Sequence, residues 1–202
     1  MTKSIPALRE RTRTAMQWEI SEAAAALFVE RGYEATTMDD VAAAVGMSKR
    51  SVFRYFPFKE DLALGKFDAL AAAMLEVLRT RPLDEPIWAT LRAMLDVLVP
   101  HIDSVDKESV SAAMQRLIFQ TPDLLAGYLE RQNRVQEAVV AAIRERAGEA
   151  GRPYAADDPS PRVLAATAFG CLIAAQRTWL DAGADSFADV LARALSVPSG
   201  IS

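Results

Sequence analysis

The residues best suited to chemistry in this chain are basic or hydroxyl-bearing, and they gather in one short segment. Between residues 46 and 59 there is no acidic side chain, and the basic and hydroxyl-bearing ones are Ser48, Lys49, Arg50, Ser51, Arg54, Tyr55 and Lys59. Arginine pairs bidentately with guanine, whereas lysine, serine and tyrosine suit contacts to phosphate. The segment therefore indicates nucleic-acid binding, with an ordinary solvated charged surface as the alternative.

The charge of the whole chain supports a local basic patch. The formal net charge is −4, but residues 1–59 carry nine Lys or Arg against seven Asp or Glu, and residues 60–202 carry fourteen against twenty. A protein that bound nucleic acid over its whole surface would be basic throughout. The distribution predicts one small phosphate-facing surface near the N-terminus.

Other chemistries find little support in the sequence. There is no glycine-rich phosphate loop, no nucleophile-elbow pattern and no pair of histidines, and Cys171 lies among apolar neighbours where a thiol is usually inert. His101, with Asp103, Asp106 and Glu108, is the one candidate metal cluster, and a lone histidine is weak evidence for a metal. We expect no catalytic residue, no metal and no cofactor.

Composition is typical of a folded soluble protein. The 202 residues are 51% hydrophobic and 25% charged, and the longest apolar stretch, residues 163–180, is interrupted by Gln176 and Arg177. The basic N-terminus has no apolar stretch behind it, which disfavours a signal peptide. A single cysteine excludes an internal disulfide and fits a reducing compartment. We expect a cytoplasmic protein without membrane contact.

Periodicity predicts an all-α chain, because apolar residues recur at helical spacing and nowhere alternate for long. Caps and breakers divide the chain into about nine helices, at residues 8–31, 38–45, 49–56, 59–79, 87–102, 107–120, 122–147, 162–181 and 186–195. Residues 148–161, rich in Gly, Pro and Asp, read as an exposed loop.

Two short helices near the N-terminus form a predicted helix-turn-helix. Thr37 and Ser48 are suitable N-caps for them, and Gly46 makes the turn between them. Gly32 ends the preceding long helix. The apolar residues expected to face the core are Val41, Ala42, Val45, Val52, Phe53 and Phe56. The outer face of the second helix is then left with Lys49, Arg50, Ser51, Arg54 and Tyr55, placed to enter a major groove.

These residues resemble the tetracycline-repressor (TetR) family of regulators. The resemblance spans about residues 10–65 and is carried in register by Leu27-Phe28, Gly32-Tyr33, Ala35-Thr36-Thr37-Met38, Asp40-Val41-Ala42, Val45-Gly46-Met47-Ser48, Val52-Phe53-Arg54-Tyr55-Phe56 and Lys59-Glu60-Asp61-Leu62. One departure is Phe58, where the family often has a small polar residue; a missing cap costs about 1 kcal/mol unless Phe58 packs as a hydrophobic staple.

The resemblance implies a homodimer that binds a roughly palindromic double-stranded DNA operator and responds to a ligand. By position, Thr37, Tyr55 and Lys59 look like phosphate contacts, Thr37 being at least an N-cap. Ser48, Lys49, Arg50 and Ser51 look like groove-facing residues, with Arg54 as a further candidate. We expect a DNA-binding domain over residues 1–65 and a ligand-binding and dimerisation domain over residues 66–202.

The last two predicted helices look like the dimer interface, with packing inside one chain as the alternative. An apolar stripe on the final helix and small residues on the one before it permit close helix packing. The candidate interface residues are Leu164, Ala168, Leu172, Ala175, Phe187, Val190, Leu191 and Ala194.

The ligand is expected to be a small hydrophobic or amphipathic molecule that releases a repressor from DNA. Methionine and aromatic side chains line adaptable pockets, although each is also ordinary core. The candidates are Met74, Trp88, Leu91, Met94, Met114, Phe119, Tyr128 and Trp179. Residues 116–122 and a helix with Arg131 and Arg134 weakly resemble acyl-CoA-type regulators, although solvated arginines are the favoured interpretation. Activation in place of repression, and control by a protein partner, remain open.

Overall fold

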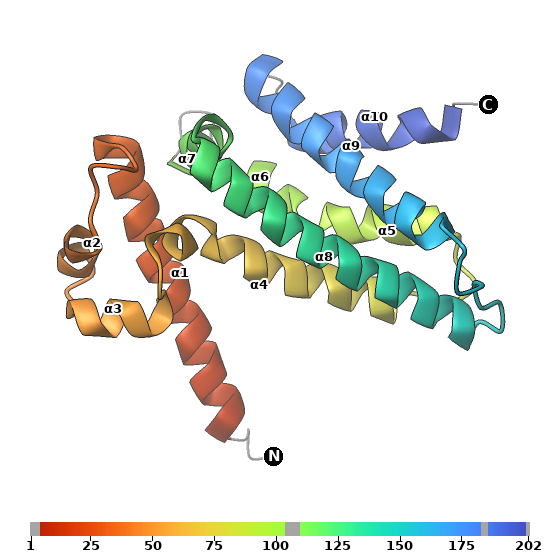
Figure 1. The fold of residues 1–202 in the computed structure, drawn as a ribbon, viewed down its shortest axis with the longest axis horizontal. Coiled ribbons are helices and arrows are strands. Elements are labelled where there is room, and N and C mark those ends of the chain that lie inside the picture. The colour runs from red at the N-terminus through yellow and green to blue at the C-terminus, as the bar shows by residue number, and fades with distance from the viewer. Residues whose placement is uncertain (1–4, 104–109, 183–185, 201–202) are drawn as a thin grey trace. The chain divides into compact units, whose positions relative to one another are not determined.

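The computed structural model describes residues 5–103, 110–182 and 186–200, and these ranges hold ten helices and no strand (Figure 1). The all-α prediction is confirmed. In chain order the helices are α1 (Ile5–Arg31), α2 (Met38–Ala44), α3 (Lys49–Tyr55), α4 (Lys59–Thr80), α5 (Ile87–Asp96), α6 (Val99–Asp103), α7 (Val110–Gln120), α8 (Pro122–Glu149), α9 (Ser160–Ala182) and α10 (Phe187–Gly200).

The helix expected over residues 87–102 is two helices, α5 and α6. Pro100 has no amide hydrogen to donate to the Asp96 carbonyl, and its ring clashes with that carbonyl, which favours a break in the helix before residue 100. The chain tightens there, and the Leu98 amide donates to the Leu95 carbonyl at 3.0 Å. At the other end of the chain, α10 extends five residues beyond the predicted end and passes through Pro198.

The chain divides into two compact units. The first comprises Met1–Asp68 with Glu108–Tyr128, and the second comprises Ala69–Lys107 with Leu129–Ser202. Both α4 and α8 pass from one unit into the other along the sequence. The first unit therefore contains α7 and the start of α8 in addition to the predicted helix-turn-helix.

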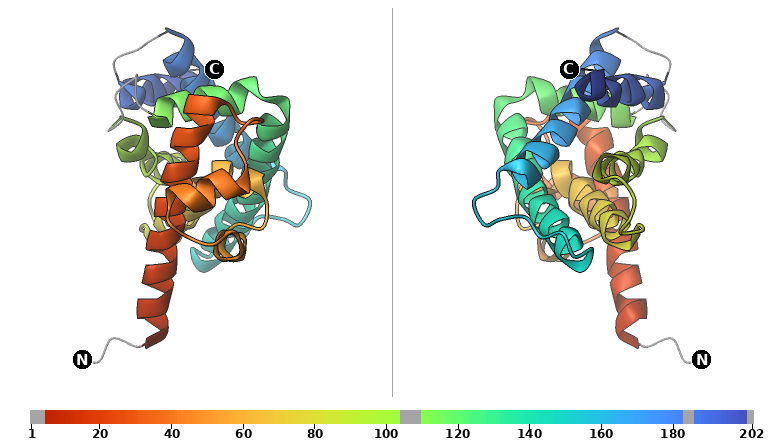
Figure 2. Two further views of the ribbon diagram at one scale, coloured as in Figure 1. Left: turned by 90° about the vertical axis from the view of Figure 1, so that its left-hand side faces the viewer. Right: turned by 90° about the vertical axis from the view of Figure 1, so that its right-hand side faces the viewer.

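A single apolar cluster holds the first unit together. Residues of α1, α2, α3, the start of α4, α7 and the start of α8 all contribute, and α7 packs along α1 (Figure 2, left). The fully or nearly buried members are Ile20, Ala24, Leu27, Phe28, Met38, Val41, Ala42, Val52, Phe56, Leu62, Met114 and Leu124.

The second unit is built around α9, which packs against α10 and α5, while α6 packs on α10 and α5 (Figure 2, right). The Trp88 indole Nε1–H of α5 donates to the Leu195 carbonyl of α10 at 3.2 Å. Residues 160–181 are long and apolar enough to span a membrane by length and composition, a property shared by core helices of soluble proteins. Only 39% of that window is buried within the chain, so much of α9 is left uncovered.

Candidate nucleic-acid interface

Helix α2 begins at a complete capping box. The Thr37 hydroxyl accepts from the Asp40 amide at 3.2 Å, and the Asp40 carboxylate accepts from the Thr37 amide at 2.8 Å and from its hydroxyl at 2.6 Å. These hydrogen bonds from Thr37 lower the pKa of the Asp40 carboxyl. The predicted N-cap role of Thr37 is confirmed, and the residue stays exposed.

Left-handed glycines shape the chain on both sides of α2. Gly32 (φ +90°) ends α1 and Gly46 (φ +64°) ends α2, as predicted, because other residues adopt this conformation only with strain. The buried Thr36 hydroxyl fixes the first turn by donating to the carbonyls of Gly32 at 2.9 Å and Leu27 at 3.2 Å.

Helix α3 starts at Ser48, whose hydroxyl accepts from the Ser51 amide at 3.2 Å and lies 2.9 Å from the Ser51 hydroxyl. Val52 and Phe56 are buried and anchor the helix, as predicted. Phe53 does not join them: it is 39% exposed, because it lies one residue, or about 100°, around the helix from Val52. Residues four apart share a face, and that spacing would have separated Phe53 from the core pair.

The outer face of α3 carries the predicted basic residues. Lys49, Arg50 and Arg54 are exposed, while Ser51 and Tyr55 are half-buried. Arg54 lies over the Tyr55 ring at 5.5 Å. Lys49 pairs with Asp39 of α2 at 2.6 Å, and Arg50 makes no ion pair with any residue that the structure describes.

Lys59 lies at the start of α4, beside the loop that precedes α2. Its Nζ lies 4.2 Å from the centre of the Tyr33 ring and donates to the Glu34 carbonyl at 3.3 Å. The Tyr33 ring also packs edge-on against Phe28, with centroids 5.1 Å apart. Burial, and next the negative charge of Glu60, raise the pKa of Tyr33 to about 12. A neutral, fixed ring thus supports the Lys59 ammonium.

Phe58 does not act as a hydrophobic staple, because it is 70% exposed. The start of α4 is instead fixed by Asp61, whose carboxylate accepts from the Phe58 amide at 3.1 Å. A carboxylate at this position also interacts favourably with the helix dipole. The departure at residue 58 is therefore compensated three residues later.

Two parts of the chain match two family profiles. The profile described as "Bacterial regulatory proteins, tetR family" matches residues 20–65, and the one described as "MftR C-terminal domain" matches residues 85–198. The chain belongs to the TetR family. Its relatives are named transcriptional regulators and repressors, so this member is a transcriptional regulator and not an enzyme.

Among these relatives is the HTH-type transcriptional regulator TcmR of Streptomyces glaucescens, 36% identical over 73% of this chain and 67% of TcmR. Another is the HTH-type transcriptional repressor AcnR of Corynebacterium diphtheriae, 29% identical over 64% of each chain. The TetR fold is shared by FadR of Bacillus subtilis in complex with stearoyl-CoA, with a TM-score of 0.64, 18% identity and coverage of 93% of this chain and all of that one.

The predicted dimer residues of this TetR regulator lie mostly inside the single chain. Leu164 and Ala194 are half-buried, and the other six are buried between α9 and its neighbours: Ala168, Leu172, Ala175, Phe187, Val190 and Leu191. Those six pack within the chain, which was the alternative interpretation. The uncovered face of α9 carries Val163, Ala166, Gly170, Ala174 and Thr178, together with the charged residues Arg177 and Asp181.

The predicted ligand-pocket residues fall into both units. Four of them are buried in the second unit: Met74, Leu91, Met94 and Trp179. Trp88, in the same unit, is half-buried and donates a hydrogen bond to the Leu195 carbonyl. Met114 belongs to the core of the DNA-binding unit. Phe119 and Tyr128 also lie in that unit, where their rings meet edge-on at 5.7 Å.

The structure also bears on the sequence interpretations of two arginines, the cysteine and the histidine. Arg131 is buried, so its interpretation as a solvated residue is wrong, whereas Arg134 is exposed as expected. Burial raises the pKa of the Cys171 thiol, which keeps it protonated. His101 is exposed, and the described residues hold no metal-binding cluster; Asp106 and Glu108 lie outside them.

Proposed function

We propose that this TetR regulator is a repressor that binds a palindromic operator as a homodimer and is released by a small hydrophobic or amphipathic molecule. The observation that carries the proposal is the exposed basic face of α3, which is anchored from behind by Val52 and Phe56. A helix held in this way can enter the major groove. AcnR, a relative, is named a repressor.

Two groups of residues have different roles in the proposal. Thr37, Tyr55 and Lys59 contact phosphates on either side of the groove, while Arg50, with Lys49 and Ser51, reads base edges. Ser48 orients the helix start. Arg54 contacts the backbone or a base, and the exposed Phe53 offers an apolar contact to a thymine methyl group.

Two substitutions test the phosphate contacts. Tyr55→Phe and Lys59→Ala should weaken binding to operator and random DNA alike, and Lys59→Ala should lower the salt-dependence slope by about one.

A third substitution tests base reading: Arg50→Ala should weaken operator binding by about 1–3 kcal/mol with little effect on random DNA. Fluorescence anisotropy at several salt concentrations measures both effects, with Arg193→Ala on α10 as an exposed control. Unchanged affinity in both phosphate variants contradicts the assignment.

The homodimer proposal rests on the uncovered face of α9. Ala166, Gly170 and Ala174 are exposed at four-residue spacing, and a Cβ added to Gly170 meets nothing within 4 Å in the single chain. A second copy that packs here would bury the face of α9 that one chain leaves uncovered. Twofold protein symmetry also matches a palindromic operator.

Light scattering tests the dimer. Ala174→Arg should convert a dimer to a monomer and weaken operator binding, because a charge on this face has no partner when buried. Ala141→Arg, at an exposed position of α8, is the matched control and should leave the mass unchanged. A wild-type monomer, or a dimer that survives Ala174→Arg, overturns the proposed interface.

The ligand proposal concerns the interior of the second unit. Buried Met74, Leu91 and Met94 offer an adaptable apolar lining. The buried Trp179 indole Nε1–H and the Gln132 Oε1 have no hydrogen-bond partner among the described residues, and polar groups of a ligand would satisfy them. The fold neighbour FadR holds stearoyl-CoA, which supports an amphipathic ligand for this chain.

A gel shift on DNA flanking the coding region, repeated with a panel of acyl-CoA and other amphipathic molecules, tests the response. An inducer should release the DNA, and Leu91→Trp should abolish release without changing operator affinity. Release that persists in Leu91→Trp contradicts the pocket assignment. We further propose a cytoplasmic location.

A further inference from the structure

A cavity of about 450 Å³ lies in the second unit, and none of the residues proposed for the inducer lines it. Its walls come from the α4–α5 loop, the first residue of α5, the C-terminal part of α8 and the α8–α9 loop. The size falls within the range of small-molecule sites. The apolar part of the lining is Leu83, Ile87, Ile143, Ala147, Ala150 and the Tyr154 ring.

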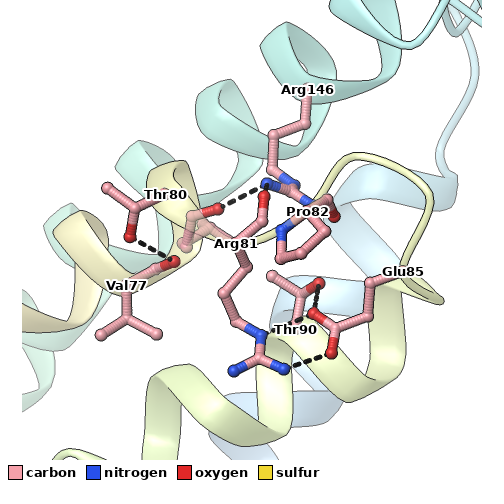
Figure 3. A network of polar contacts seen from close by, with 8 residues as sticks. Val77, Thr80, Arg81, Pro82, Glu85, Thr90 and Arg146 are labelled. Carbon is pink, nitrogen blue, oxygen red and sulfur yellow. Dashed lines mark hydrogen bonds and ion pairs between the residues drawn. The ribbon is translucent and has the colours of Figure 1, made fainter.

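Arg146 of α8 lines this cavity and is only 6% exposed. Its Nη1 donates to the carbonyls of Leu78 at 3.0 Å and Arg81 at 2.7 Å, and its Nη2 donates to that of Pro82 at 2.8 Å (Figure 3). The guanidinium thus caps the C-terminal end of α4. A guanidinium has five N–H groups, so three bonds leave its Nε–H and one Nη2–H for another acceptor.

One acidic side chain of the cavity wall, Glu85, already has hydrogen-bond partners. Glu85 accepts both a 2.5 Å bond from Arg81 Nε and a bond from Arg81 Nη2, and it accepts from the Thr90 hydroxyl at 2.9 Å (Figure 3). The Arg146 charge reaches Glu85 only as a smaller, longer-range effect. Among the described residues, Arg146 thus donates its hydrogen bonds to neutral carbonyls, although a buried cation is normally paired with an anion.

We propose that this cavity is a second ligand site, for a small organic monocarboxylate whose charge meets Arg146 and whose apolar part lies against Ile143. Arg152, exposed at the rim, adds a second positive charge. Asp84 and Glu85 in the wall disfavour a dianion. The site is separate from the inducer pocket, and the ligand would contact the clamp that fixes the end of α4.

Calorimetric titration of the intact protein with hexanoate, 1-hexanol and hexylamine tests the site. Hexanoate should bind, and the alcohol and amine should bind at least about tenfold more weakly, because only the carboxylate accepts charge-assisted hydrogen bonds. Arg146 is left unchanged, since its loss would also uncap α4. Ala150→Phe, which fills the cavity, should weaken hexanoate binding about tenfold or more, and Arg152→Ala should weaken it severalfold.

Two controls separate this site from other binding. Arg193→Ala removes an exposed arginine outside the cavity, and Leu91→Trp alters the proposed inducer pocket; both should bind hexanoate like wild type. Thermal unfolding by circular dichroism checks that each variant is folded. The site is overturned by absent hexanoate binding, by equal binding of 1-hexanol, by a folded Ala150→Phe variant with wild-type affinity, or by loss of binding in Leu91→Trp alone.

Discussion

The contribution of an ion pair to protein stability depends on how far water reaches it, and two ion pairs in this regulator differ in their exposure. The Lys49 and Asp39 side chains are 52% and 62% exposed, so their pair contributes about 0–1 kcal/mol. A DNA phosphate can therefore replace Asp39 at little cost. Arg81 and Glu85 are 39% and 17% exposed and bond bidentately, and Thr90 adds a third contact. Because of this geometry, the Arg81–Glu85 pair contributes to the stability of the fold.

The Glu85 pair predicts a pH dependence of stability. Hydrogen bonds from Arg81, above all, lower the pKa of Glu85 from about 4.5 to about 2. Because the pKa of Glu85 is lowered in the folded state, the ionised carboxylate contributes fully to the stability of the protein above pH 4.5, and this contribution is lost as the pH falls toward 2. Glu85→Gln should therefore be less stable than wild type at pH 7, and the difference should shrink between pH 4.5 and 2.

Urea unfolding at several pH values measures this difference. Glu145→Gln, at an exposed position of α8, provides a control with the same change in charge. A gap between wild type and Glu85→Gln that stays constant from pH 7 to pH 2 would contradict the role given to the pair.

At the scale of helices, features set by neighbouring residues were predictable from the sequence. Thr37, Ser48, Gly32 and Gly46 define helix ends through local hydrogen bonds and backbone conformation, and all four do so in the structure. The basic outer face of α3 followed from the same reasoning.

Features that depend on tertiary packing were not predictable. Arg131 was expected to be solvated and is buried, because the charge of a side chain does not say which side of a helix another helix will cover. The cap on α4 comes from Arg146, at least 64 residues away in sequence. The burial of most predicted dimer residues inside the chain has the same origin, since an apolar stripe does not say whether a helix of the same chain or a second copy will cover it.

Gly65 illustrates how closely α4 approaches the DNA-binding helices. A Cβ at this position would lie 2.7 Å from Cε1 of the buried Phe56 ring. Gly65→Ala should destabilise the protein by about 1–3 kcal/mol, despite a gain of about 1 kcal/mol in helix propensity. Gly148→Ala, also helical but with open space around it, should stabilise by about 0.5–1 kcal/mol. Urea unfolding of both variants measures the contrast, and equal effects would contradict the contact.

At the scale of the molecule, the DNA-binding unit includes a segment from the second half of the chain. Met114 and Leu124 lie in the same core cluster as Phe28 and Val52. Met114→Ala should destabilise this unit by about 2–5 kcal/mol and weaken operator binding, although residue 114 touches no DNA in the proposed complex.

Amide NMR spectra distinguish local from general effects of that substitution. Met114→Ala should shift resonances of α1–α3, whereas Met74→Ala, an equally buried methionine of the second unit, should shift mainly those of α5 and α9. If Met114→Ala instead shifted mainly resonances of α5 and α9, Met114 would belong to the core of the second unit.

The chain enters the DNA-binding unit twice, and this limits how such a regulator can be re-engineered. A chimera that exchanges only residues 1–65 with a relative would set a foreign α1 against the native α7, and the mismatched side chains would leave voids or clashes. Grafting a new operator preference therefore calls for changes on the solvent side of α3, or for a transplant with two junctions that carries residues 108–128 along.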